Sequence, residues 1–198
     1  KQYAAISEEF YSELKNETVF YSGEIIDFIT NTKGELTTIP LGANLPFYKN
    51  KKLKINFDEY DYEGKVLSGI KPKNEILNLA FIYLNSPFLW GGKTPFGIDC
   101  SGFTQMVYKL FGYQLFRDAK QQATQGEVLS FIEESEPGDL AFFDDDDGEI
   151  IHVGIILDNY TIIHAHGKVR IDTLDHSGIF NVDLQKHTHK LRVIRKLV

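Results

Sequence analysis

The chain has 198 residues, of which 42% are hydrophobic, and 15 Phe and 10 Tyr can fill a core. This length suits one large domain or two small ones, and the apolar content excludes a disordered chain. The net charge of -7 argues against nucleic acid as a partner, because phosphate backbones bind basic surfaces.

The first 68 residues predict a short helix followed by short strands. Apolar side chains recur at helical spacing over residues 1–15, at Tyr3, Ile6, Phe10 and Leu14. Runs of β-branched and aromatic residues predict strands at 19–21, 25–29 and 53–57. Several short strands in so few residues indicate a small β-barrel. Residues 69–72 are a predicted linker, so we expect domains at 1–70 and 71–198.

Helices followed by strands are predicted in the second domain. Asn74 is expected to cap a helix ending near Asn85, apolar nearly all round and therefore buried. A second helix should begin at Cys100 or Ser101, and a third short helix should run from Asp118 to Gln125. Strands are predicted at 140–143, 151–157, 161–166, 168–172 and 190–196. This order gives an α+β domain with an antiparallel sheet.

The single cysteine, Cys100, stands where a Gly-rich loop meets a predicted helix. Unpaired N–H groups and the positive end of the helix dipole meet at this point. Both favour a thiolate, so we expect a lowered pKa and a catalytic nucleophile. The same N–H groups could stabilise an oxyanion. The alternative is a small buried hydrophobe with no chemical role.

A thiolate nucleophile needs an imidazole partner, and a predicted hairpin supplies three. His152 lies in its first strand, and His164 and His166 lie in the second. Their even numbers place them on one face, and a turn centred on Asn159 sets Gly154 opposite His164. Spacing leaves open whether His164 or His166 orients His152. The remaining histidines are predicted to be solvated: His176, His187 and His189.

A zinc site is the alternative interpretation of the same residues. Cys100, His152 and His164 would give three ligands and an open position. We favour the nucleophile and expect no metal and no cofactor. The acidic run at residues 144–147 lacks the alternation of a calcium loop, so it is predicted to be a solvated loop.

Five motifs in order resemble the NlpC-type papain-like cell-wall peptidases over residues 73–197. They are Trp90-Gly91-Gly92, Asp99-Cys100-Ser101-Gly102-Phe103, Pro137-Gly138-Asp139-Leu140, His152-Val153-Gly154-Ile155 and Ile162-Ile163-His164-Ala165. The resemblance implies a papain-like catalytic domain with Cys100 as nucleophile, His152 as general base and acid, and His164 as the residue that orients His152. Residues 1–68 resemble the bacterial SH3-like barrel that often precedes such a domain.

The resemblance also implies a substrate. Such relatives cleave γ-D-glutamyl bonds in murein stem peptides, and many require a free N-terminal L-Ala and so release L-Ala-γ-D-Glu. Asp99 and Ser101 match positions that help bind substrate, and a carboxylate there would pair with the ammonium terminus. Trp90, Phe88 and His166 are further expected contacts. Tyr60 and Tyr62 of the barrel are expected at the rim of the cleft.

One position departs from the family pattern. Many relatives carry Tyr twelve residues before the nucleophile, where the hydroxyl faces the active site, and this chain has Phe88. One lost oxyanion donor costs roughly a hundredfold in rate. This motivates a second hypothesis, a catalytically weakened module that binds cell-wall peptides.

The remaining expectations concern the setting of the protein. We expect a monomer. No apolar run is long enough to span a bilayer. No signal peptide is present, but Lys1 is not an initiator methionine, so a mature or trimmed form is compatible with the sequence. We expect the cell envelope, periplasmic or lipoprotein-anchored with the signal removed, and the cytoplasm is the alternative.

Overall fold

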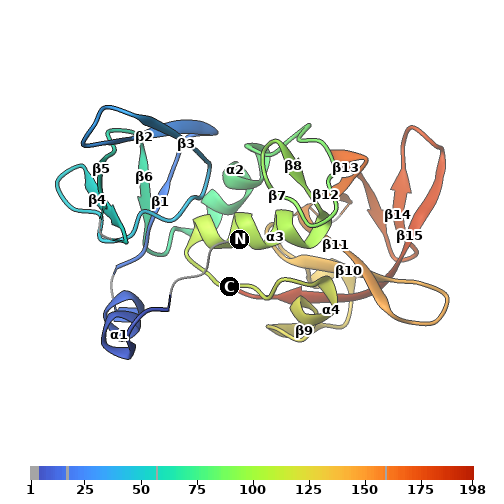
Figure 1. Ribbon diagram of the computed structural model, residues 1–198. Helices are drawn as coiled ribbons and strands as arrows, with labels where there is room; N and C mark the ends of the chain where they lie inside the picture. The colour runs from blue at the N-terminus through green and yellow to red at the C-terminus, as the bar shows by residue number, and fades with distance from the viewer. Residues whose placement is uncertain (1–4, 17, 57, 159) are drawn as a thin grey trace. The chain divides into compact units, whose positions relative to one another are not determined.

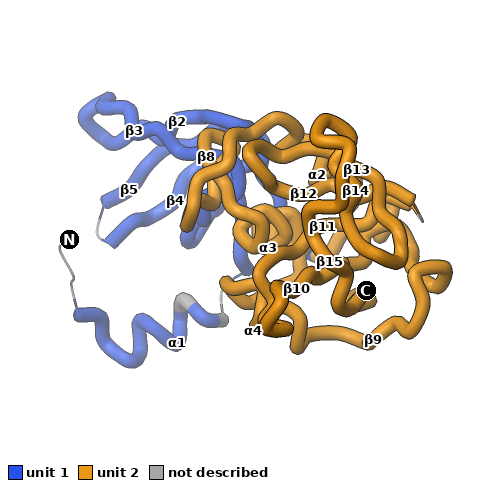
Figure 2. The backbone as a smooth tube through the Cα atoms, turned by 90° about the vertical axis from the view of Figure 1, so that its right-hand side faces the viewer, with its two compact units in different colours: residues 1–69 blue, residues 70–198 orange. Residues whose placement is uncertain are grey.

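The computed structural model describes residues 5–16, 18–56, 58–158 and 160–198. The chain divides into two compact units, Lys1–Gly69 and Ile70–Val198, drawn in blue and orange in Figure 2. This division falls one residue before the expected boundary. None of the helices in the described ranges has the length and apolar character that a membrane crossing needs.

The first unit is a short helix followed by six short strands. Four strands form one sheet in the order β3-β2-β5-β4, and the other two form a second sheet, β1-β6. The elements are α1 (Glu8–Asn16), β1 (Phe20–Ser22), β2 (Ile26–Asn31), β3 (Leu36–Pro40), β4 (Lys52–Ile55), β5 (Asp58–Asp61) and β6 (Val66–Ser68). The helix begins later than expected, and Tyr3 lies outside the described residues.

Both small sheets enclose one core. Ile29 and Leu53 of the larger sheet are buried in it, together with Tyr62, which follows β5. Phe20 and Val66 of the smaller sheet pack against it. Six short strands around a shared apolar core give the SH3-like β-barrel that the texture of the sequence predicts.

The second unit has its α-helices first and a large antiparallel sheet after them (Figure 1). Before the sheet come the 3-10 helix η1 (Lys73–Glu75), α2 (Ile76–Phe81), β7 (Lys93–Thr94), β8 (Gly97–Ile98), α3 (Cys100–Phe111) and α4 (Ala119–Gln122). Then follow β9 (Glu127–Leu129), the 3-10 helix η2 (Ile132–Glu134), β10 (Leu140–Asp144), β11 (Ile150–Asp158), β12 (Thr161–His166), β13 (Lys168–Asp175), β14 (Gly178–Asn181) and β15 (Lys186–Lys196).

The sheet of the second unit closes on itself. Its order is β10-β11-β12-β13-β14-β15-β9, and β10 also pairs with β15. Helix α3 packs against β11 and β12 (Figure 1). Its interior holds a cluster of apolar side chains, whose fully buried members are Ala141, Phe143, Ile156, Ile162, Leu174 and Ile179. The predicted α+β architecture is confirmed, and this rigid sheet carries the histidines.

The helix predicted over residues 74–85 is shorter and less buried than expected. It begins as η1, continues as α2 and ends at Phe81. Ile76 and Ala80 are fully buried, whereas Phe81 is 43% exposed. The expected cap at Asn74 is wrong, because Asn74 lies inside the 3-10 turn. The third helix also stops earlier than predicted, at Gln122.

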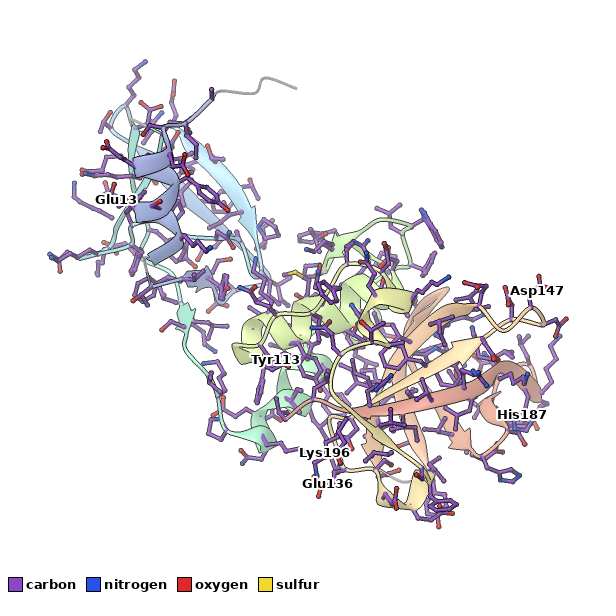
Figure 3. All side chains as sticks on the ribbon, turned by 90° about the horizontal axis from the view of Figure 1, so that it is seen from below. Glu13, Tyr113, Glu136, Asp147, His187 and Lys196 are labelled. Carbon is purple, nitrogen blue, oxygen red and sulfur yellow. The ribbon has the colours of Figure 1, made fainter. Side chains whose placement is uncertain are left out.

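A charged cluster joins the start of this unit to its last strand. The Nζ atoms of Lys73 and Lys196 lie 2.6 and 3.0 Å from the same oxygen of Glu136. Figure 3 shows Lys196 beside Glu136. The two lysines lower the pKa of Glu136 to about 2. The cluster fastens the end of β15 to the segments that precede the sheet.

Candidate active site

Cys100 is the first residue of α3, and Asp99 fixes the position of that helix start. One oxygen of Asp99 accepts the Gly102 N–H at 2.6 Å and so caps the helix. The other accepts the Gly91 N–H at 2.8 Å. A Cβ at position 102 would lie 2.4 Å from a backbone carbonyl oxygen, so only glycine fits there. The motif around Cys100 therefore builds a rigid corner between loop and helix.

Arg117 holds the same carboxylate. Its Nη2 and Nη1 lie 2.6 and 3.0 Å from the two oxygens of Asp99, and Nη1 donates to Ser101 Oγ at 2.9 Å. Burial alone would raise the pKa of Asp99, but Arg117 and two backbone N–H groups lower it. The negative charge of Asp99 is thus matched within the protein. A ligand at this position meets an ion pair and not a lone carboxylate.

A cavity of about 380 Å³ opens beside Cys100. Trp90 is 85% exposed at this cavity. The lining carries both signs of charge, with Asp99, Asp118, Arg117 and Lys120. Such a lining favours ligands that themselves carry a cation and an anion.

The thiol of Cys100 is buried, and its pKa differs from the expected direction. Burial, helped by the negative charge of Asp99, raises the pKa of Cys100 to about 11. Hydrogen bonds from the backbone N–H groups of Val153 and Ser101 act in the opposite direction but do not outweigh burial. The expectation of a lowered pKa is therefore wrong for the free protein, because the packing around the helix start removes water from the thiol.

His152 and His164 are in direct contact. Nε2 of His152 lies 2.8 Å from Nδ1 of His164, and both rings are buried. The predicted register is confirmed, since Gly154 pairs opposite His164. Burial lowers the pKa of His152 well below its usual value, and nearby imidazoles add to this effect. His152 is followed by Val153, whose backbone N–H acts on the Cys100 thiol, so strand β11 runs beside Cys100.

Gly154 makes room for this contact. A Cβ at position 154 would lie 2.9 Å from the Cβ of His164 and 2.7 Å from Ile162. Both distances are too short for real side chains, so any larger residue would displace the His164 ring or the strand that carries it.

Asp172 was not identified from the sequence, and it lies behind His164. Its Oδ2 is 3.0 Å from His164 Nε2. Arg170 holds the carboxylate with two bonds of 2.7 and 2.8 Å. Burial would raise the pKa of Asp172, but His164 and Arg170 outweigh it and lower the pKa to about 2. Strand β13 thus supplies a carboxylate that bonds to His164 on the side away from His152.

Two further histidines surround His152. His189 stacks on its ring with centroids 4.1 Å apart, and His166 lies 4.9 Å from His189. Burial lowers the pKa of His189 to about 4. The prediction that His189 is solvated is wrong, because β15 begins earlier than expected and turns this residue toward the site. His166 is exposed, and His187 lies at the surface, bonded to Asp175 (Figure 3).

The geometry does not fit the zinc alternative. Both ring nitrogens of His164 are occupied, one by His152 and the other by Asp172. A metal held by Cys100, His152 and His164 would need one of these nitrogens. Across the described ranges, no three His, Cys, Asp or Glu side chains are placed to hold a metal ion.

The acidic run is a loop, apart from its first residue. Asp145 Oδ1 accepts N–H groups of Asp147 and Glu149 at 3.1 and 2.9 Å, which closes a tight turn with Asp147 at its tip (Figure 3). Asp144 differs from the expectation of a solvated run. It ends β10 as a buried residue with the Arg192 guanidinium 3.6 Å away.

The other expected substrate contacts have varied surroundings. Phe88 is 37% exposed, and its backbone N–H donates to Gly167. Tyr60 is half-buried in the first unit. Tyr62 is only 1% exposed, and its hydroxyl donates to the carbonyl of Lys65. The prediction that Tyr62 reaches a cleft is wrong, because its ring forms part of the barrel core.

Comparison with known proteins identifies the family. Residues 85–190 match the NlpC/P60 family. The chain belongs to the NlpC/P60 family. It is 37% identical over 93 residues to the Gamma-D-glutamyl-L-lysine dipeptidyl-peptidase of Bacillus subtilis (strain 168), a match covering 46% of this chain and 31% of that protein. It is 34% identical over 156 residues to the Dipeptidyl-peptidase 6 of Lysinibacillus sphaericus, covering 76% and 53%.

Solved structures share the fold of this NlpC/P60 chain. An NlpC/P60 family protein from Bacillus cereus ATCC 10987 has a TM-score of 0.75 at 20% identity, covering 96% of this chain and 66% of that one. The NlpC/p60 domain of the peptidoglycan hydrolase SagA has a TM-score of 0.52 at 27% identity, covering 64% and 100%. The chain spans about a third of the Bacillus subtilis relative and about half of the Lysinibacillus one.

Proposed function

We propose that this chain is a cysteine peptidase that hydrolyses the γ-D-glutamyl bond of murein stem peptides and releases L-Ala-γ-D-Glu. The observation that carries the proposal is the Cys100 thiol beside β11, with His152 and His164 joined at 2.8 Å. Both relatives are named as dipeptidyl-peptidases, which supports this reaction, and the name of the Bacillus subtilis relative supports this bond. A substrate in murein makes the cell envelope the proposed place of action.

The acylation step follows from the protonation of the free site. Burial favours a neutral thiol at Cys100 and a neutral imidazole at His152. As the sulfur attacks the γ-carbonyl carbon of D-Glu, His152 takes the thiol proton. The tetrahedral intermediate then collapses, the C–N bond breaks, and the departing amine takes that proton from His152. L-Ala-γ-D-Glu remains as a thioester on Cys100.

Deacylation uses the same residues in reverse. A water molecule attacks the thioester carbon while His152 takes one of its protons. The C–S bond breaks, and the proton returns from His152 to the Cys100 sulfur. The dipeptide leaves with a free γ-carboxyl group, which loses its proton to the solvent, and the site is ready for another cycle.

Substrate recognition rests on the mixed charge of the cavity. L-Ala-γ-D-Glu carries an ammonium group and an α-carboxylate, and the lining pairs Asp99 with Arg117. The ammonium group fits beside Asp99 and the carboxylate beside Arg117, so each opens one side of the resident pair. The requirement for a free N-terminus is part of this proposal.

Hydrolysis of the tripeptide L-Ala-γ-D-Glu-L-Lys tests the proposal. Wild type should release L-Ala-γ-D-Glu and free lysine, and Cys100→Ala should release neither. The N-acetylated tripeptide separates recognition from chemistry, since it should be a poor substrate if the ammonium group is bound. Parallel reactions with meso-diaminopimelate in place of lysine identify the preferred diamino acid. Equal release by wild type and Cys100→Ala would sink the proposal.

Phe88 favours a second candidate, a weakened module that binds murein peptides without turnover. A Phe ring cannot donate the hydrogen bond that a Tyr hydroxyl would offer. Calorimetric titration of wild type with the tripeptide distinguishes the two. Heat of binding without product supports the module, whereas product formation excludes it. If wild type forms product slowly, Phe88→Tyr should raise its rate.

A further inference from the structure

We propose that Asp172 is a positioning residue that sets the tautomers of both buried imidazoles, with Arg170 holding its carboxylate in place. The inference deepens the proposed function and rests on it for its catalytic meaning. The proposed role of Asp172 involves no contact with substrate or with Cys100. It acts through His164 on His152.

The contacts form an unbroken buried chain. Asp172 Oδ2 lies 3.0 Å from His164 Nε2, and His164 Nδ1 lies 2.8 Å from His152 Nε2. The side chains of His164 and Asp172 are both 0% exposed. Buried polar groups must find partners within the protein, so these bonds fix each ring in one orientation. Water cannot replace any link without opening the sheet.

The ionised carboxylate of Asp172 determines which ring nitrogen carries the hydrogen in His164 and in His152. A carboxylate accepts hydrogen bonds and donates none, so His164 must carry its hydrogen on Nε2. Burial lowers the pKa of His164 despite Asp172, so the ring is neutral and its Nδ1 is an acceptor. His152 must then donate from Nε2. Its Nδ1 is left with a lone pair, which is the form that can take the thiol proton from Cys100.

Arg170 makes this arrangement stable. It donates to both oxygens of Asp172, and the Val182 N–H donates to Oδ1 at 3.2 Å. Four donors therefore saturate the carboxylate and keep it charged. Arg170 also contacts Asp183 at 2.8 Å, but that carboxylate is 72% exposed and touches neither imidazole. Asp183 is thus a natural control for charge near Arg170.

Asp172→Asn should reverse the tautomers. The amide oxygen keeps two donors, Arg170 Nη2 and Val182 N–H, if it takes the Oδ1 position, and the amide nitrogen then faces one donor, Arg170 Nε, where the flipped amide would face two. The amide nitrogen then stands at the Oδ2 position and donates to His164 Nε2. His164 must in turn donate from Nδ1 to His152, which moves the hydrogen of His152 to its own Nδ1. The base that serves Cys100 is lost although every residue of the proposed triad remains.

Nitrogen NMR of the imidazole rings tests the inference without reference to turnover. In ¹⁵N-labelled wild type, both His152 and His164 should give Nε2–H tautomers, assigned with His152→Gln and His164→Gln. Asp172→Asn should shift both to Nδ1–H, and Asp183→Asn should shift neither. An Nδ1–H tautomer in either ring of wild type would overturn the inference, even if Asp172→Asn fails to fold.

Kinetics on the tripeptide provide the second arm. Asp172→Asn should lower kcat by about a hundredfold with little change in KM, because one proton acceptor is lost. Asp183→Asn should keep kcat within about twofold of wild type. An Asp172→Asn variant with wild-type kcat would contradict the inference. If wild type shows the expected tautomers but cleaves no tripeptide, the proposed function fails and the positioning of the rings stands.

Discussion

Two buried carboxylate–arginine pairs flank the proposed catalytic residues, and they differ in what else they touch. Asp99 and Arg117 lie at the start of α3 and line the cavity beside Cys100. Asp172 and Arg170 lie in β13 behind His164. The first pair faces the place where a ligand would bind, and the second faces an imidazole. By our two proposals, the same chemical pair serves ligand recognition on one side and proton placement on the other.

Burial explains why each pair is held so tightly. An ionised carboxylate removed from water is costly unless donors surround it. Asp99 has backbone N–H groups and Arg117, and it keeps one side toward the cavity. Asp172 has no such opening and is 2% exposed. A change to Asp172 should therefore disturb the fold as well as the site, whereas a change to Asp99 should act more on the ligand.

Replacing the His152 ring should have the largest effect on kcat. His152→Gln removes the proposed general base and should lower kcat by about a thousandfold. His189→Gln is the matched control, since that ring stacks on His152 without holding a proton for Cys100, and it should cost less than about tenfold. Rates on the tripeptide measure both. Similar losses in the two variants would mean that stacking and not proton transfer matters.

Removing the carboxylate of each pair should lower the free energy of unfolding by different amounts. Asp172→Ala leaves Arg170 and His164 without their partner in a dry interior and should cost about 3–5 kcal/mol. Asp99→Ala loses a helix cap and frees an arginine that reaches solvent, so it should cost about 1–2 kcal/mol. Urea unfolding of both variants gives the comparison. A larger loss for Asp99→Ala would contradict this reading of the two environments.

Adding a methyl group at Gly154 should disturb the His164 ring and leave the cavity beside Cys100 unchanged. Gly154→Ala places a Cβ 2.9 Å from the Cβ of His164, so the ring must shift and kcat should fall at least about tenfold. The KM should change little, because the cavity lining is untouched. A raised KM with an unchanged kcat would contradict this prediction, because it would mean that the substitution disturbs the cavity and not the imidazoles.

Lowering the pH should lower the free energy of unfolding through the buried histidines. The pKa of His152 lies well below its unfolded value, and the pKa of His189 is lowered to about 4. The unfolded chain therefore binds more protons than the fold below about pH 6.5, so stability falls as pH falls through that value. Each buried imidazole should contribute about 1 kcal/mol per pH unit. Urea unfolding of wild type and His189→Gln measures the slope, which should be smaller in the variant.

The smallest effect is expected at the exposed end of the second pair. Asp183→Asn removes a 2.8 Å contact to Arg170 from a side chain that is 72% exposed. Such surface pairs contribute less than about 1 kcal/mol. High salt should leave wild type and this variant almost equally stable. A loss as large as that of Asp172→Ala would mean that the outer carboxylate also positions Arg170.

Local patterns predicted much of this site, because its nearest residues lie on neighbouring strands. The tight hairpin fixed the register of Gly154 opposite His164. Asp172 was accessible by the same logic, since the turn at Gly167 sets His164 opposite Arg170 and leaves Asp172 two residues further along one face. His189 was not, because β15 pairs with β10 and β14 over long range. The raised pKa of Cys100 also depends on packing that no local pattern contains.

The most direct test compares two conservative variants on one substrate. Asp99→Asn keeps an oxygen for the helix cap but removes the charge that would meet the substrate ammonium group. Asp172→Asn keeps the shape but reverses the proton placement. Steady-state kinetics with L-Ala-γ-D-Glu-L-Lys should show a raised KM for Asp99→Asn and a lowered kcat for Asp172→Asn. The same parameter changing in both variants would contradict the division of the two pairs.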